Sequence, residues 1–218
     1  MLSATSHFSS IRPVSGGSSI SPAELFRSGD LVIRRLGDFH ERLASDLLVR
    51  RMYAWRGYRA NPHTTPQPDS GRVTLVAWQD NVLAATLTLS HDSGNGLLCE
   101  ALYPDEIANL RARNLKVCEY SRLAIDPDFS SPALMDAFFR TAYNFARSHF
   151  HASDALVEIN PRHCRYYERE LGFTRLGPLR VCPRVNAPAI LLHRNLLHPF
   201  PKLLQNRRPQ HLQSVKVS

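Results

Sequence analysis

The stretch Val117-Cys-Glu-Tyr-Ser-Arg-Leu-Ala-Ile-Asp126 is apolar enough to form a buried β-strand, yet it carries the charges of Glu119 and Arg122. Side chains alternate between the two faces of a strand, so these two charges should point apart. A β-bulge between them would insert one residue and bring both to the same side. Because an isolated buried charge is very costly, the stretch predicts either a buried ion pair or a functional cleft.

The composition of the whole chain limits what this strand can belong to. The chain has 218 residues, 43% of them hydrophobic, and a net charge of +8. That length supports one sizeable core rather than two full domains. The basic balance favours acidic partners, but no nucleic-acid-binding fingerprint accompanies it, so we expect no nucleic-acid partner. No apolar run is long enough to span a bilayer, so we expect no integral membrane segment.

The two ends differ in composition from the middle. We expect a disordered, Ser-rich segment over residues 1–28, a folded domain over 29–197 and a basic tail over 198–218. The N-terminus lacks the basic start and apolar core of a secretory signal, which predicts a cytoplasmic protein. The cysteines have neither zinc nor disulfide spacing and are interpreted as buried thiols in a reducing cytoplasm. They are Cys99, Cys118, Cys164 and Cys182.

Strand and helix patterns alternate along the folded part. The expected strands are Leu31–Leu36, Val73–Trp78, Val82–Ser90, Lys116–Asp126, Asp154–Asn160 and Ala189–Leu196. The expected helices are Asp38–Trp55, Pro104–Asn114, Ser131–Phe150 and one that begins at Pro161 and is stopped by Gly172. Asp38 is expected to cap the first helix and Ser131 the third. An initial hairpin followed by alternating elements predicts an α/β (α+β) fold, with a mixed central β-sheet flanked by helices on both faces.

Two further features favour a functional cleft. Arg51 and Trp55 lie one turn apart on one face of the first helix. Tyr166 and Tyr167 precede Leu-Gly-Phe in the last helix. Taken singly, the first pattern also fits a solvated Arg51 and a core Trp55, and the second also fits a helix packed by aromatic side chains. The order of these motifs along the chain therefore carries more weight than any one motif.

Together these pieces resemble the GCN5-related acyltransferase superfamily. The element order matches, and Tyr167–Phe173, Tyr-Glu-Arg-Glu-Leu-Gly-Phe, resembles its late-helix signature Tyr-Glu-Lys-x-Gly-Phe with one residue more. The resemblance implies a GCN5-related N-acyltransferase fold. The extra residue argues against the usual general-acid role of the tyrosine, and we expect Tyr167 among the substrate-binding residues.

The segment after the central strand departs from that superfamily. Members that use coenzyme A carry a glycine-rich loop here, whose backbone amides hold the pyrophosphate. Residues 125–139, Ile-Asp-Pro-Asp-Phe-Ser-Ser-Pro-Ala-Leu-Met-Asp-Ala-Phe-Phe, contain no glycine, and Asp126 and Asp128 would repel a pyrophosphate. This predicts a donor whose acyl chain is carried on the phosphopantetheine of an acyl carrier protein, with acyl-coenzyme A a poorer donor.

One branch of the superfamily fits this departure. Glu119-x-x-Arg122 and Arg51-x-x-x-Trp55 are similar to motifs of the acyl-homoserine-lactone synthases, and residues 160–192 are closer to the related N-acyl amino acid synthases. Those bacterial enzymes join a long-chain acyl group from acyl carrier protein to the α-amine of an amino acid. The alternatives are a homoserine-lactone-type signal synthase that needs S-adenosylmethionine, an acetyl-coenzyme-A-dependent acetyltransferase, and a non-catalytic binding module.

The implied reaction, aminolysis of a thioester, assigns roles to the residues of the central strand. Glu119 would accept the proton of the α-ammonium, and Ser121 would donate to the thiolate leaving group. Arg122 and Arg51 would either hold Glu119 or grip the substrate carboxylate. The backbone amides around Leu123 and Ala124 would polarise the thioester carbonyl, and Trp55 would contact substrate. No metal or tightly bound cofactor is expected, because His149, His151 and His163 lack zinc spacing.

Three arginines of the last predicted helix suggest how an acidic carrier protein would dock. Arg162, Arg165 and Arg169 lie at i, i+3 and i+7 and would form one basic face. Such a face is either a solvated surface or a dock for the carrier protein, and the net charge fits the second interpretation.

Overall fold

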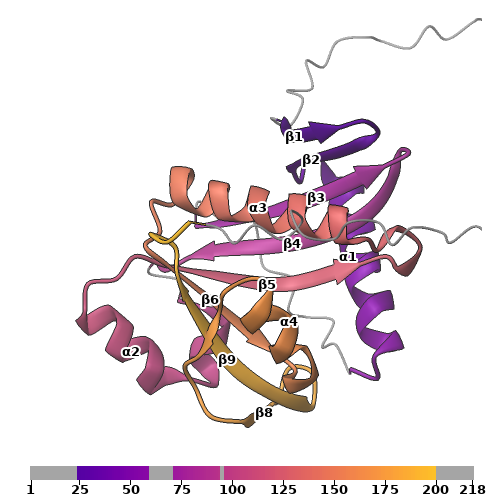
Figure 1. The fold of residues 1–218 in the computed structure, drawn as a ribbon. Helices are drawn as coiled ribbons and strands as arrows, with labels where there is room; N and C mark the ends of the chain where they lie inside the picture. Colours follow the sequence, from indigo (N-terminus) through magenta and orange to yellow (C-terminus); the bar gives the residue numbers. More distant parts are fainter. Residues whose placement is uncertain (1–23, 59–70, 94–95, 200–218) are drawn as a thin grey trace, which may run out of the picture.

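The computed structural model describes residues 24–58, 71–93 and 96–199 and places them in a mixed sheet flanked by helices (Figure 1). The strands follow the spatial order β1-β2-β3-β4-β5-β6-β9-β7, with β8 paired to β9. Their pairings are antiparallel except β5–β6, which is parallel. The strands are β1 (Glu24–Ser28), β2 (Leu31–Arg35), β3 (Arg72–Gln79), β4 (Val82–His91), β5 (Val117–Ile125), β6 (Asp154–Ile159), β7 (Thr174–Arg175), β8 (Arg180–Cys182) and β9 (Ala187–Asn195). The predicted fold class is confirmed.

The helices begin where the sequence provides caps. They are α1 (Phe39–Trp55), α2 (Pro104–Ala112), α3 (Pro132–His149) and α4 (Cys164–Arg169), with 3₁₀ turns η1 (Leu98–Ala101), η2 (Pro127–Phe129) and η3 (Pro161–His163). The Asp38 side chain accepts from the Glu41 N–H at 3.0 Å, and Ser131 accepts from the Leu134 N–H at 3.1 Å. Both predicted caps are therefore confirmed, each satisfying a backbone donor that the helix leaves unpaired.

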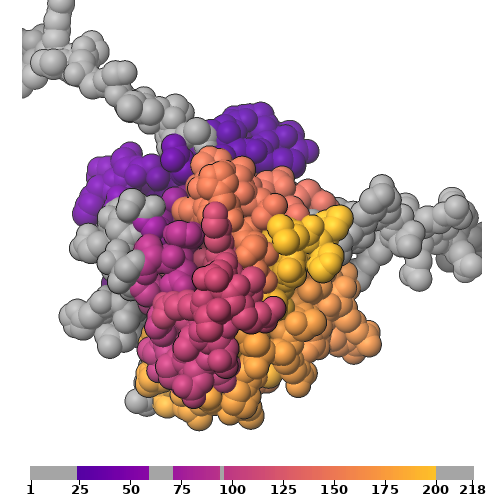
Figure 2. All heavy atoms as spheres, turned by 90° about the vertical axis from the view of Figure 1, so that its left-hand side faces the viewer, coloured from indigo at the N-terminus to yellow at the C-terminus, as the bar shows by residue number. Residues whose placement is uncertain are grey.

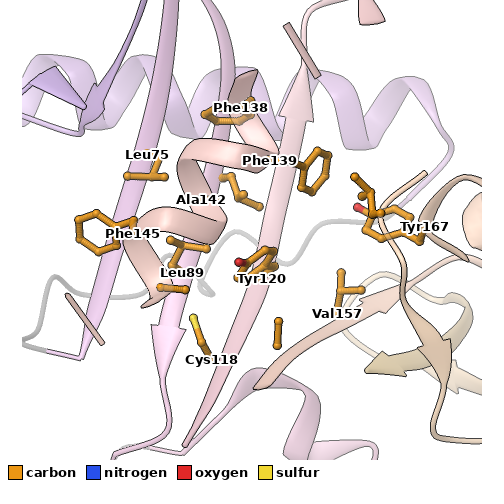
Figure 3. Close-up of a cluster of buried hydrophobic side chains, with 14 of the residues drawn as sticks. Leu75, Leu89, Cys118, Tyr120, Phe138, Phe139, Ala142, Phe145, Val157 and Tyr167 are labelled. Atoms are coloured by element: carbon orange, nitrogen blue, oxygen red, sulfur yellow. The ribbon is translucent and has the colours of Figure 1, made fainter. Parts of the chain in front are cut away.

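Alternation along the strands assigns the helices to two faces of the sheet. Cys118 and Tyr120 of β5, with Val157 of β6, belong to the core beneath α3 and α4 (Figure 3). Their neighbours Val117 and Leu156 point to the opposite face and pack against α2. The α1 helix packs on that opposite face as well, through the buried residues Leu48, Val49 and Met52. In Figure 1, α3 accordingly crosses the sheet on the side away from α1.

The structure changes two boundaries that the sequence predicted. Residues 24–28, assigned to a disordered segment, form β1, because Gly29 adopts a φ of +56° in a tight turn and Phe26 packs onto the core. Residues 1–23 and 200–218, the rest of both predicted tails, lie outside the described residues. The helix expected to begin at Pro161 and to be stopped by Gly172 is shorter and divided, since the chain forms η3 and then a short α4 that ends at Arg169.

Two expectations about the whole chain concern its cysteines and membranes. All four cysteines are buried and unpaired, which confirms the interpretation as buried thiols. Within the described residues, no helix combines the length and the apolar character needed to cross a bilayer.

Candidate active site

The predicted β-bulge lies in β5. Thr88 of β4 is opposite Ser121 and Thr86 is opposite Ala124, so Arg122 and Leu123 together face the single residue between those threonines. Arg122 takes a φ of +54°, a left-handed conformation that a non-glycine residue adopts only where its surroundings hold it. The bulge reverses the alternation of β5, and Glu119 and Arg122 consequently line the same cavity.

A second irregularity opens the centre of the sheet. The β5–β6 pairing ends at Tyr120 and Val157, although β5 continues to Ile125 and β6 to Ile159. Two cavities of about 160 Å³ and about 790 Å³ lie where the strands separate. Both are lined by Tyr120, Ser121, Arg122 and Glu158, so they adjoin each other along β5. The backbone edge of residues 121–125 that would face β6 lies outside the ladder and borders this space.

Glu119 is held at the wall of the smaller cavity by backbone donors. The residue is 1% exposed, and its Oε2 and Oε1 atoms accept from the N–H groups of Leu98 and Cys99 at 2.6 Å and 2.9 Å. Burial raises the pKa of Glu119 to about 7, against the opposing pull of these N–H groups and of Arg184. A carboxyl group with this pKa can take up and release a proton near neutral pH, as a general base requires.

The two arginines expected to hold Glu119 have other partners. Arg122 Nη2 pairs with Asp46 Oδ1 of α1 at 2.6 Å, both side chains being largely buried. Arg51 pairs with Asp126 at the end of β5, and among the described residues it lines neither cavity. The structure therefore brings Arg122 into the site and leaves Arg51 outside it.

The larger cavity is mostly apolar. Its lining residues include Leu87, Leu123, Ile125, Met135, Val157, Tyr166 and Tyr167. Tyr167 packs edge-on against Phe139 and Phe173, with ring centroids 5.9 Å and 5.7 Å away. Burial raises the pKa of Tyr167 and raises that of Tyr166 to about 12, so both hydroxyls keep their protons. This compartment suits an aliphatic chain.

The remaining predicted residues divide between the cavities and their surroundings. Ser121 lines both cavities, and its Oγ donates to the Thr88 carbonyl at 3.4 Å. Ala124 is buried against α1. Trp55 is not a core tryptophan, because it is 70% exposed. It lines the larger cavity, with the Arg56 guanidinium 5.5 Å from its ring centroid.

The three arginines proposed as a dock do not share one helix. Arg162 lies in η3, where its Nη2 donates to the Tyr58 hydroxyl at 2.6 Å and its guanidinium lies over the Tyr58 ring. Arg165 and Arg169 are exposed on α4. Because Tyr58 lines both cavities, Arg162 is the one of these three arginines whose side chain donates a hydrogen bond to a described residue of the site.

Sequence reasoning missed the residues that reach the smaller cavity from late in the chain. Arg184 Nη2 pairs with Glu158 Oε2 of β6 at 2.6 Å, and both residues line that cavity. Arg184 follows β8, whose segment lies against the α2 segment (orange against pink in Figure 2). Tyr103 fixes this contact, because its hydroxyl lies 3.1 Å and 3.0 Å from the carbonyl oxygens of Pro178 and Ala189, which share its single proton. No spacing in the sequence indicates that Arg184 reaches β5.

Comparisons with known proteins agree with this architecture. A family model described as N-acyl amino acid synthase FeeM matches residues 44–195. The solved structure of FeeM, an N-acyl amino acid synthase from uncultured soil microbes, is 27% identical and has a TM-score of 0.72, covering 81% of this chain and 94% of that chain. No curated protein sequence matches.

Two more distant structures share the fold. The acyl-homoserine-lactone synthase LasI is 14% identical with a TM-score of 0.55, covering 76% of this chain and 89% of its own. ElaA from Escherichia coli is 9% identical with a TM-score of 0.57, covering 76% of this chain and 99% of its own. With a GCN5-related fold and a family match over most of its length, the chain is an acyltransferase that belongs to the N-acyl amino acid synthase FeeM family.

Proposed function

We propose that this acyltransferase joins a long-chain acyl group, delivered by acyl carrier protein, to the α-amine of an amino acid. The observation that carries the proposal is the position of Glu119, a buried carboxyl with a pKa of about 7, at a small cavity with several charged lining residues beside a larger, mostly apolar cavity. The two compartments suit a polar acceptor and an aliphatic donor, and Ser121 and Arg122 border both.

The sizes of the cavities fit these substrates. A cavity of about 150 Å³ holds benzene, so the smaller cavity, at about 160 Å³, has room for an acceptor of modest size. Its charged lining includes Glu119, Glu158, Arg122 and Arg184, which offers partners for an ammonium and a carboxylate. Each methylene that the larger cavity removes from water contributes about 0.8 kcal/mol, which favours a long acyl chain.

The reaction needs one proton to move before the new bond forms. Glu119 takes a proton from the α-ammonium, directly or through a water molecule, and such general-base help contributes about 10²–10⁴-fold. The free amine then attacks the thioester carbonyl, forming the C–N bond. Backbone N–H groups beside the bulge stabilise the oxyanion. The C–S bond breaks, and the departing thiolate receives the second proton that the nitrogen gives up as the amide forms. Glu119 then releases its proton to solvent.

The loop between β5 and α3 supports a carrier-linked donor over a coenzyme A thioester. The Asp126 carboxylate accepts from the Asp128 N–H at 3.2 Å and pairs with Arg51. Ser131 caps the α3 N-terminus through the Leu134 N–H. Amides that a pyrophosphate would need are thus satisfied by side chains of the chain itself, and two carboxylates stand nearby.

Parallel steady-state assays test the proposal. The enzyme is supplied with one acyl chain as the carrier-protein thioester and as the coenzyme A thioester, each with the twenty amino acids and with S-adenosylmethionine. Mass spectrometry of the products should show an N-acyl amino acid, with the higher kcat/KM for the carrier-linked donor. Equal or better kcat/KM with coenzyme A would contradict the donor, and a lactone from S-adenosylmethionine would contradict the acceptor.

A further inference from the structure

Arg184 and Glu119 are hydrogen-bonded to the same backbone peptide group. Arg184 Nη1 donates to the Leu98 carbonyl oxygen. The peptide unit that contains this carbonyl also contains the Cys99 N–H, which donates to Glu119 Oε1 at 2.9 Å. In a trans peptide the C=O and N–H bonds point in opposite directions. One planar group therefore has a guanidinium on one side and the Glu119 carboxyl on the other.

This arrangement has a defined electrostatic effect. A hydrogen bond to the carbonyl oxygen polarises the peptide and makes its N–H a better donor, by roughly 10–30% in condensed-phase estimates. A guanidinium stays charged at any pH at which the protein is folded, so this effect is constant while Glu119 titrates. Glu158 pairs with Arg184 at 2.6 Å and brings the opposite charge toward the same carboxyl.

We propose that Arg184 is a positioning residue that orients the Glu119 carboxyl and favours its ionised form through the Leu98–Cys99 peptide, with Glu158 opposing it. The inference rests on the proposed function, in which Glu119 is the base. It assigns a role in the reaction to the segment after β8, far from β5 in the sequence.

Other titratable groups around Glu119 do not produce the same effect. They are Cys99 of η1, Cys118 of β5, Cys182 of β8, Arg50 and Tyr53 of α1, Tyr58, and Arg122. Burial raises the pKa of the Cys99, Cys118 and Tyr53 side chains, and raises that of Cys182 to about 11, so all four are neutral while Glu119 titrates. Arg122 pairs with Asp46, and the charges that act on the pKa of Glu119 are those of Arg184 and Glu158 rather than those of Arg122 or Arg50. Arg184 and Glu158 are the charges whose removal should move the titration of Glu119 in opposite directions.

Two substitutions of opposite sign test the proposal by ¹³C NMR titration of the glutamate side-chain carboxyls, which needs no activity. Arg184→Met should raise the pKa of Glu119 by on the order of one unit, because it removes the favourable charge. Glu158→Gln should lower that pKa, and Arg184→Lys, which keeps the charge, should shift it less than Arg184→Met. In the pH profile of kcat/KM, the acidic limb should move in the same directions.

Arg180→Met is the matched control. Arg180 also donates to a carbonyl of the same region, that of Leu102, and pairs with Glu106 at 3.1 Å. The N–H of that peptide, from Tyr103, donates to the Cys99 carbonyl rather than to Glu119. Arg180→Met should therefore leave the titration of Glu119 unchanged.

The outcomes separate this inference from the proposed function. An unchanged titration of Glu119 in Arg184→Met, or an equal shift in Arg180→Met, overturns the positioning role. If Arg184→Met does not fold, the direction of the shift in Glu158→Gln decides, and an upward shift overturns the proposal. Opposite shifts in a protein that makes no N-acyl product support the positioning role and refute the proposed function alone.

Discussion

Replacing Glu119 by glutamine should slow the reaction and remove a pH dependence of the stability of the fold. The folded-state pKa of Glu119 is raised from 4.5 to about 7, so the fold prefers the protonated group. This contribution to stability is fully present below pH 4.5 and is lost as the pH rises through about 7. At 1.36 kcal/mol per pKa unit, the loss is about 3 kcal/mol.

Glutamine cannot ionise, so Glu119→Gln should remove this pH dependence. Its amide nitrogen cannot accept a hydrogen bond, so one of the Leu98 and Cys99 N–H groups loses its partner, at a cost of about 1–3 kcal/mol, and at pH 5 the variant should melt below the wild type. From pH 5 to pH 8 the melting temperature of the variant should rise by about 6–12 °C relative to that of the wild type, since a change of 1 kcal/mol shifts the melting temperature of a chain of this size by about 2–4 °C. Its kcat at pH 8 should fall about 10²–10⁴-fold.

Thermal melts at pH 5 and pH 8, with kinetics at pH 8, measure these effects. Glu168→Gln is the control, because Glu168 forms an exposed pair with Arg175 and its loss should change stability by less than about 1 kcal/mol at both pH values. A Glu119→Gln variant whose melting temperature relative to the wild type is the same at pH 5 and pH 8, and that turns over normally, would refute the reasoning. It would show that Glu119 does not titrate near neutral pH in the folded protein and that the reaction does not need its carboxylate.

Three further predictions address the surface, the larger cavity and the scaffold. Reversing the charges of Arg162, Arg165 and Arg169 to glutamate should slow association with acyl carrier protein and weaken its salt dependence, and unchanged association kinetics would exclude this surface as the dock. Leu123→Trp should partly fill the larger cavity and shift preference to shorter acyl chains, by up to about fourfold in kcat/KM per methylene excluded; an unchanged chain-length profile would place the acyl chain elsewhere. Asp38→Ala should cost about 1 kcal/mol of stability in denaturant melts by removing the α1 cap while kcat stays unchanged, and a loss of kcat would show that α1 couples to the chemistry.

The sequence could predict features that depend on near neighbours. Two charges in an apolar stretch were enough to single out Glu119 and Arg122 and to predict a bulge, because strand alternation is a local rule. The caps of α1 and α3 follow from residues three positions apart. The short β1 was missed because its residues form a strand only by pairing with the edge of β2.

The partners of the site could not be predicted in the same way. The N–H groups that hold Glu119 come from Leu98 and Cys99, and the charges near it come from Glu158 and Arg184. These contacts depend on how η1, β6 and the β8 segment pack together in three dimensions, which the spacing of residues along the sequence does not indicate. The orientation of Arg51 likewise depends on the rotation of α1 against the sheet, which turns this side chain toward Asp126.

The bulge in β5 also limits how this protein can be recombined with its relatives. Before Arg122, even-numbered side chains such as Cys118 and Tyr120 enter the α3 core, and after it odd-numbered ones such as Leu123 and Ile125 do. A chimera whose two parents are joined within β5 takes the bulge from only one of them. If the joined strand lacked the extra residue of the bulge, the side chain of Leu123 would point toward α1. Crossover points should therefore keep residues 117–125 together with β4, whose register matches the bulge.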